Sequence, residues 1–377
     1  MNDFEHAELV EAEAEVMDQL VSVYGDTDWS GVMAWMAANP GSESNPNVMM
    51  IPLSLANVYL NRFERNRDAG DLERATRWAE WVAANHVLWG ERWLTGAVAG
   101  YLTLTAYRLR EHALIDGYGD RMSRLVNVAV EVLAVEANAR LAADLPYRVA
   151  ENDDPYDSSQ TGDTKAEENA WEAGLLATAA VFAPDDPNAA TWERKARQLA
   201  YDALSAPGDP PDADGIKTTT INADYFLSNH HCFPNPYYTG ATLLLLTQGA
   251  LMYRLAGRPI PVEFSHNVGA VHAVYRSMID GHLEWTESSD PSGDATLFPL
   301  AYDADLEVRA VARRLGEGYL WKPTSPVSQM TVGDVLWTAV MNSKVVYVYL
   351  VGSYLWHAQP GSPEPPVPDL PVCTAPG

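Results

Sequence analysis

The sequence predicts an all-α protein, organised as an (α/α)6 toroid in which helical hairpins close into a ring. Three observations support this prediction. Apolar residues recur with the period of a helix in about twelve segments, strand-like runs are short and isolated, and connections between helices alternate between short and long. No repeat of about 34 or 40 residues occurs, which favours a closed ring over an open solenoid. An irregular helical bundle is the alternative, because periodicity alone does not separate the two.

Helical periodicity covers most of the chain. The expected helices occupy residues 5–23, 29–38, 49–66, 71–85, 92–113, 120–143, 165–182, 187–204, 236–256, 262–279, 298–315 and 331–352. Short strand candidates occur at 217–221 and 345–351.

Residues typical of helix ends support several of these boundaries. Asp71 and the pair Asp186 and Pro187 are expected to start helices. Thr164 and Glu167 fit the T-x-x-E capping box, in which each side chain accepts a hydrogen bond from the other residue's backbone N–H.

The domain organisation follows from the connections. A single helical domain is expected over residues 1–357, and the proline-rich segment 358–377 is expected to form an extended tail. Three connections are longer than compact domains usually keep without a functional reason. They span residues 144–164, 205–235 and 280–297, and each mixes acids with aromatic residues or histidine. These loops are therefore expected to meet at one mouth of the ring.

The charge excludes several partners. Asp and Glu number 51 against 25 Lys and Arg, a formal net charge of -26. This field repels phosphate backbones and anionic lipids, so neither nucleic acid nor a membrane is expected as a partner. Cys232 and Cys373 are too few for a disulfide framework. Because no signal peptide or membrane-spanning pattern occurs, the protein is expected inside the cell unless a signal absent from this sequence directs export.

The densest group of chemically capable side chains precedes the apolar segment 239–256. It supplies bases that titrate near neutrality, phenolic acids, and amide donors for a developing oxyanion. Its members are Asn222, Asp224, Tyr225, Asn229, His230, His231, Tyr237 and Tyr238. We interpret it as a catalytic loop with Asp224 and His231 binding substrate; the alternative is a loop whose His and Asn cap the next helix.

The segment SNHHCFPNPYYTGATLLLLTQGALMYRLAGR, residues 228–258, resembles the Asn-His segment of (α/α) toroid polysaccharide lyases such as the alginate lyase and heparinase II/III groups. The resemblance implies β-elimination, with Asn229 neutralising the substrate carboxylate and His230 taking or relaying the proton. It also implies a tyrosine acting as acid and base, and Tyr225, Tyr237 and Tyr238 remain open for that role.

One feature departs from that family. Those lyases act on uronate polymers and usually carry basic residues around the site, whereas Lys217 is the only Lys or Arg in residues 205–235. The acidic field opposes a polyanionic substrate, so a neutral glycan stays an alternative.

A second group consists of carboxylates at the start of the expected helix 165–182. Glu168 and Glu172 lie four residues apart, and paired carboxylates can divide acid and base roles in glycoside hydrolysis. Glu172 is the candidate catalytic acid and Trp171 a candidate substrate-binding residue. The alternative is that Glu172 belongs to a structural ion pair.

A third group lies in the loop 280–297. Trp285 offers a stacking platform for sugar, and Glu284 and Asp290 offer acceptors for its hydroxyl groups. The alternative is an acidic surface loop with turn chemistry. No EF-hand spacing, H-E-x-x-H motif, P-loop or dinucleotide-binding motif occurs, so no metal and no cofactor are expected.

Together these patterns predict a carbohydrate-active enzyme that cleaves the glycosidic linkages of a polysaccharide or oligosaccharide by β-elimination. A glycoside hydrolase acting on a neutral glycan through paired carboxylates is the first alternative. The others are a terpenoid or small-molecule lyase or isomerase, whose aromatic cavity stabilises carbocations, and a non-catalytic glycan-binding protein.

Overall fold

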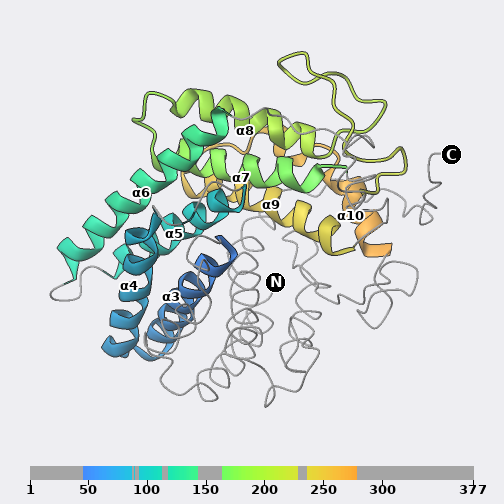
Figure 1. Ribbon diagram of the computed structural model, residues 1–377. Coiled ribbons are helices and arrows are strands. Elements are labelled where there is room, and N and C mark those ends of the chain that lie inside the picture. Colours follow the sequence, from blue (N-terminus) through green and yellow to red (C-terminus); the bar gives the residue numbers. More distant parts are fainter. Residues whose placement is uncertain are drawn as a thin grey trace. The chain divides into compact units, whose positions relative to one another are not determined.

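The computed structural model describes residues 46–86, 89, 93–112, 118–142, 164–227 and 236–277 (Figure 1). Within these ranges the chain forms helices and irregular connections, with no strand, which confirms the all-α class. None of the helices described is long and apolar enough to cross a membrane. The expected helices before residue 46 and after residue 279, and the predicted tail, lie outside the described residues.

The described helices fall into two compact units. The first holds α3 (Pro46–Asn66), α4 (Ala69–Ala84), α5 (Trp93–Glu111) and α6 (Gly119–Leu141) as far as Asn138. The second holds the end of α6 with α7 (Ala166–Phe182), α8 (Ala189–Ala203), α9 (Pro236–Leu255), the 3-10 helix η4 (Val262–Ser265) and α10 (Val268–Ser277). The predicted single domain over 1–357 includes residues outside the described ranges and stays a prediction.

In the first unit, α3 and α4 form a hairpin around a buried acid. The helix α4 begins before the predicted start at Asp71, because the carboxylate of Asp68 accepts a hydrogen bond from the Gly70 N–H at 2.8 Å and serves as the cap. Asp71 is fully buried instead and lies 3.3 Å from Nε of Arg62 and 3.2 Å from Nη1 of Arg74. Its role is to hold the two helices together.

In the second unit, α7 lies between α8 and α9 (Figure 1). Every side chain from Ala173 to Ala180 is buried, and small residues allow the neighbouring backbones to approach closely. A Cβ on Gly174 would lie 3.5 Å from the carbonyl oxygen of Leu245 on α9. The predicted helix 165–182 therefore forms the interior of this unit.

Three predicted boundaries differ from the structure. The cap of α7 is Lys165 in the left-handed region (φ 60), with no capping bond from its side chain, and the Glu167 carboxylate accepts a hydrogen bond from Trp171 Nε1 at 2.9 Å. The cap is therefore one residue later than the predicted Thr164. The helix α8 begins at Ala189, because the Asp186 carboxylate accepts a bond from the backbone N–H of Asn188 at 2.8 Å.

The third difference is the division of the predicted helix 262–279. Asn267 takes a positive φ of 53, which ends η4 and starts α10 in a new direction. Its side-chain amide donates to the Leu204 carbonyl at 2.8 Å, so a contact from another part of the chain maintains the break.

The predicted strand at 217–221 is also wrong. These residues form hydrogen bonds with the end of α8 instead of with a neighbouring strand. The hydroxyl of Thr220 donates to the Asp202 carbonyl at 2.6 Å, and the backbone N–H groups of Thr220 and Ile221 donate to the Ser205 carbonyl. The other strand candidate, 345–351, lies outside the described residues.

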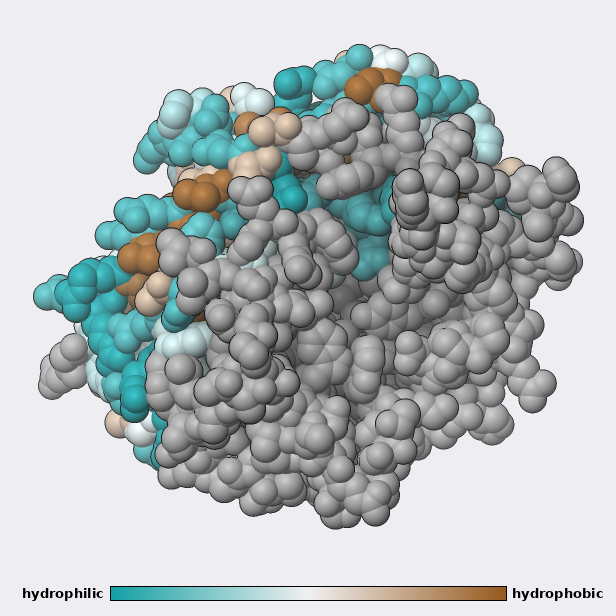
Figure 2. Space-filling view, viewed as in Figure 1, coloured by the Kyte–Doolittle hydropathy of each residue, from teal (hydrophilic) through white to brown (hydrophobic). Residues whose placement is uncertain are grey.

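The surface of the described residues is mostly hydrophilic in Figure 2, with a few brown positions between teal ones. Val128 and Val135 on α6 and Val262 on η4 are among the exposed large apolar side chains.

The contact between α9 and η4 supports a test of this packing. A Cβ at Gly249 would lie 2.3 Å from Cε1 of Phe264, whose ring is 1% exposed and packs against Tyr253. Gly249→Ala is therefore expected to destabilise the protein by about 1–3 kcal/mol, which a thermal or urea unfolding curve would measure. Gly269→Ala on α10 is the control, because its Cβ would meet no atom within 4 Å. Equal unfolding midpoints for the two variants would contradict this packing.

Candidate functional site

The predicted lyase residues are only partly described. Asn229, His230 and His231 lie outside the described residues, and Tyr237 and Tyr238 are placed only as backbone in the first turn of α9. Their proposed roles remain predictions.

Tyr225 and Asp224, by contrast, lie in a described turn, and both are exposed. The Asn222 N–H donates to the Phe226 carbonyl at 2.8 Å and closes this turn, in which Tyr225 has a φ of 63. The turn presents the phenol of Tyr225 to solvent.

The two acids of the second group are engaged by different cations. Glu172 is 1% exposed, and its carboxylate lies 3.4 Å from Nε of Arg140. Glu168 lies 3.0 Å from Nζ of Lys165. Trp171 is half-buried. This ion pairing is the alternative weighed against catalysis, and the catalytic role of Glu172 stays a prediction. Glu284, Trp285 and Asp290 lie outside the described residues.

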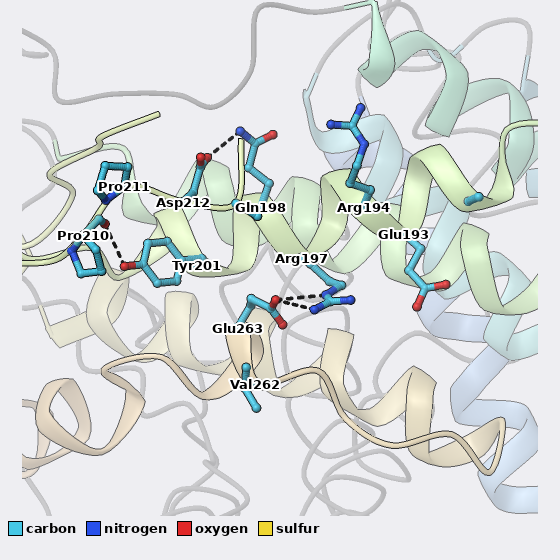
Figure 3. A pocket seen from close by; sticks show the side chains of 12 residues that line it. Glu193, Arg194, Arg197, Gln198, Tyr201, Pro210, Pro211, Asp212, Val262 and Glu263 are labelled. Carbon is cyan, nitrogen blue, oxygen red and sulfur yellow. Dashed lines mark hydrogen bonds and ion pairs between the residues drawn. The ribbon is translucent and has the colours of Figure 1, made fainter. Parts of the chain in front are cut away.

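The structure does contain a pocket that sequence analysis missed, and we call it the α8 pocket. It has a volume of about 580 Å³ and lies between the outer face of α8, the following loop and η4 (Figure 3). Its lining residues are Ala190, Glu193, Arg194, Arg197, Gln198, Tyr201, Pro210, Pro211, Asp212, Ala213, Val262 and Glu263.

The wall from α8 follows from helical spacing. Residues 190, 194, 197 and 201 recur every three or four positions, which places them on one face of the helix. The opposite face of α8 carries the buried Trp192, Ala196 and Leu199. The helix therefore buries one side and offers the other to the pocket.

The second wall is a turn organised by Asp212. Its Oδ1 accepts hydrogen bonds from the backbone N–H groups of Asp214 at 2.9 Å and Ile216 at 2.8 Å, a common use of an Asp side chain in turns. Its Oδ2 accepts a bond from Nε2 of Gln198 at 2.6 Å, which ties the turn to α8 (Figure 3). Gln198 in turn accepts a bond from Nζ of Lys195 at 2.7 Å.

Both arginines of the lining are paired with carboxylates. Arg197 donates from Nε and Nη2 to Oε1 of Glu263, at 3.1 and 2.7 Å (Figure 3). Arg194 donates to both carboxylate oxygens of Asp214, and Glu193 accepts from Arg258 at 2.5 Å. The pocket therefore presents no excess of positive charge.

Behind the pocket wall lies Asp202, an acid with no exposed surface. Its Oδ1 accepts a hydrogen bond from the Thr218 hydroxyl at 2.7 Å. Burial, reinforced by the neighbouring Asp212 carboxylate, raises the pKa of Asp202 to about 7, although the Thr218 bond and Lys195 act in the opposite direction. Burial likewise lowers the pKa of Lys195.

At the other end of the pocket, Tyr201 stacks on His266 with 4.0 Å between ring centroids, and its hydroxyl donates to the Pro210 carbonyl at 2.9 Å. Nε2 of His266 lies 2.9 Å from Oδ2 of Asp209. Asp209 Oδ2 also accepts from the Ala206 N–H at 2.7 Å and from Asn267 Nδ2 at 2.8 Å. This network fixes the loop against η4.

Chemically, the α8 pocket combines an apolar part with a polar rim. Pro210, Pro211 and Val262 provide apolar area, and the arginines and carboxylates provide donors and acceptors. No group of three or more His, Cys, Asp or Glu that could hold a metal occurs among the described residues. The sequence signal for this site was the length of the predicted loop 205–235. Residues 210–213, in the acidic first half of that loop, line the pocket.

Asp209 provides a test of the loop anchor. Burial favours its neutral form, but hydrogen bonds from Ala206, His266 and Asn267 outweigh burial and lower the pKa of Asp209. Asp209→Ala is therefore expected to cost about 2–3 kcal/mol of unfolding free energy at pH 7. Because a lowered pKa stabilises the fold above the unfolded value of about 3.9, the difference from the parent protein should shrink as the pH falls to about 3.

Urea unfolding at the two pH values would measure this effect. Asp214→Ala is the control, because the Asp214 side chain is exposed and pairs with the exposed Arg194, a kind of contact worth at most about 1 kcal/mol. An Asp209 variant that loses no more stability than the Asp214 variant would contradict the anchoring role.

Comparisons with known proteins do not add to this picture. No protein family model, no curated protein and no solved structure matches the chain. A functional assignment therefore depends on the chemistry of the residues themselves.

Proposed function

We propose that the chain is a carbohydrate-active protein that binds a neutral sugar unit of a glycan in the α8 pocket. The observation that carries this proposal is the internal pairing of the pocket's charges. Both arginines of the lining, Arg194 and Arg197, contact carboxylates, so the pocket offers polar groups without a field that selects an ion.

The remaining hydrogen-bonding capacity suits hydroxyl groups, which both donate and accept. The bonds of Arg197 to Glu263 use Nε and Nη2 and leave Nη1 as a donor, and the bond of Glu193 to Arg258 uses Oε1 and leaves Oε2 as an acceptor. The apolar C–H face of a sugar ring fits against Val262, which is 77% exposed, and the two prolines.

The same pairing argues against a uronate in this pocket. Carboxylate recognition depends on an arginine or lysine whose charge is available to the ligand, and here a protein carboxylate already offsets the charge of each guanidinium group. The net charge of -26 acts in the same direction. For the α8 pocket, the neutral-glycan alternative is therefore better supported than the uronate polymer.

The catalytic part of the proposal is β-elimination at Asn229 and His230 with a tyrosine as acid and base. Hydrolysis of a neutral glycan is the second candidate, because the pairing of both lining arginines with carboxylates favours a neutral ligand. An (α/α)6 toroid is the proposed architecture, and the hairpins α3–α4 and α7–α8 support it.

Filling the pocket tests the binding site. Ala190→Phe places a large ring on the lining and is expected to weaken binding of a neutral trisaccharide such as cellotriose at least tenfold, about 1.4 kcal/mol, in isothermal titration calorimetry. Thr191→Phe is the matched control, because Thr191 is exposed on the same helix but does not line the pocket. Preferential binding of a trigalacturonate, or equal weakening by both variants, would overturn the assignment.

Product chemistry tests the reaction. Elimination creates an unsaturated ring that absorbs near-ultraviolet light, and His230→Ala should abolish that signal while leaving the fold intact, as checked by circular dichroism. Hydrolysis of neutral glycans releases reducing ends without the absorbance. Reducing ends alone would sink the lyase proposal, and neither signal on acidic or neutral polysaccharides would leave a binding protein without catalysis.

A further inference from the structure

The wall of the α8 pocket contains two carboxyl groups and an ammonium group close together. Asp202 has no exposed surface, Asp212 is 8% exposed, and the charges of both, together with that of Asp214, act on Lys195. Asp212 lines the pocket, and Asp202 lies behind it on α8.

The contacts of Asp202 leave one oxygen for a proton. Oδ1 accepts from Thr218, whereas Oδ2 is buried and accepts no hydrogen bond from the described part of the chain. Asp202 lies one helical turn after Gln198 on α8, and the Gln198 amide binds Asp212, so the chain brings the two carboxyl groups to the same part of the wall. Two carboxylates in this position repel each other, but a proton on Oδ2 turns the contact into a hydrogen bond to Asp212.

The surrounding charges supply one cation for the two acids. Lys195 on α8 donates to Gln198, which donates to Asp212. The helix α7, packed along α8, has no ionisable side chain after Glu172. On the η4 side, Glu263 is bound by Arg197 and His266 faces Asp209.

In the loop itself, Asp214 pairs with Arg194, and Lys217 is exposed. The ammonium group of Lys195 offsets one negative charge. If Asp202 and Asp212 were both ionised, the cluster would carry a net charge of about -1, and one proton on the pair removes that charge.

We infer that Asp202 and Asp212 share a single proton that holds the pocket wall in place, so that losing this proton releases the turn 212–216 and weakens sugar binding. The first half of this inference concerns the protein alone, and the second half rests on the proposed function of the α8 pocket. Asp212 connects the two halves, because it holds the turn through Asp214 and Ile216 and also faces the ligand.

The direction of the pH effect follows from burial. Burial favours the neutral acid and raises the pKa of Asp202 to about 7, well above the usual range for an aspartate. The group therefore supports the folded turn at low pH, and this support is lost as the pH rises through neutrality. A buried negative charge beside Asp212 then has no cation of its own, which favours movement of the turn toward water.

The first experiment uses the ligand-free protein. Hydrogen exchange of the Asp214 and Ile216 amides, corrected for the intrinsic effect of pH, should lose about tenfold protection between pH 6 and pH 8. Asp202→Asn should keep its protection at both pH values, because an amide cannot ionise. Asp214→Asn is the control and should behave like the parent protein, since it keeps its backbone N–H.

A second variant covers the case in which Asp202→Asn does not fold. Lys195→Met removes the cation and should move the midpoint of the exchange change upward by roughly one pH unit. Flat protection in the parent protein, or an unchanged midpoint in Lys195→Met, would overturn the shared proton.

The second experiment measures cellotriose affinity at pH 6 and pH 8. The parent protein should bind about tenfold more weakly at pH 8, and Asp202→Asn should bind equally at both. Suppose that hydrogen exchange changes with pH as expected but cellotriose binds at neither pH. The proposed function and the predicted effect on sugar binding are then wrong, whereas the shared proton is still supported. If cellotriose binds with the same affinity at both pH values, the coupling is overturned and the proposed function stands.

Discussion

The attachment of the segment after α8 to the end of that helix is the constraint on which the pocket depends. The hydroxyl of Thr218 donates a hydrogen bond to the Asp202 carboxylate, and the hydroxyl of Thr220 donates to the Asp202 carbonyl. The backbone N–H groups of Thr220 and Ile221 donate to the Ser205 carbonyl. These bonds return the chain along α8, so that residues 210–213 lie beside the outer face of the helix. Without these hydrogen bonds, little would offset the conformational entropy lost when the segment orders along α8, because few of its residues are apolar.

A second constraint is the pairing of charge across the pocket. The chain carries a large excess of acid, and self-repulsion of that kind opposes compact packing. The arginines on α8 offset it locally, since Arg194 and Arg197 each contact an acid from a different part of the chain. Surface pairs of this kind contribute little stability individually. Their larger effect here is on the character of the pocket, because they offset the charge of both lining arginines.

The helices could be predicted from periodicity because burial repeats every three or four residues along one chain segment. The predicted 165–182 differs from α7 only at its first residue. The break at Asn267 could not be predicted, because it depends on the carbonyl of Leu204 in another segment. Asp202 could not be singled out for the same reason: its burial is decided by Thr218 and by the packing of α8 on α7, whereas in sequence it is one acid among 51.

Asp71 and Asp202 are both fully buried, and their surroundings show why Asp202 is the more consequential. Asp71 lies within ion-pair distance of Arg62 and Arg74, so two guanidinium groups offset the cost of burying its charge. Asp202 has a hydroxyl group and a second acid as neighbours, and within the described residues no cation lies at ion-pair distance from it. An acid in the first setting is an ion-pair partner within the scaffold. In the second setting burial raises the pKa of the acid to about 7, which is why the inferred dependence of the pocket wall on a proton falls on this side chain.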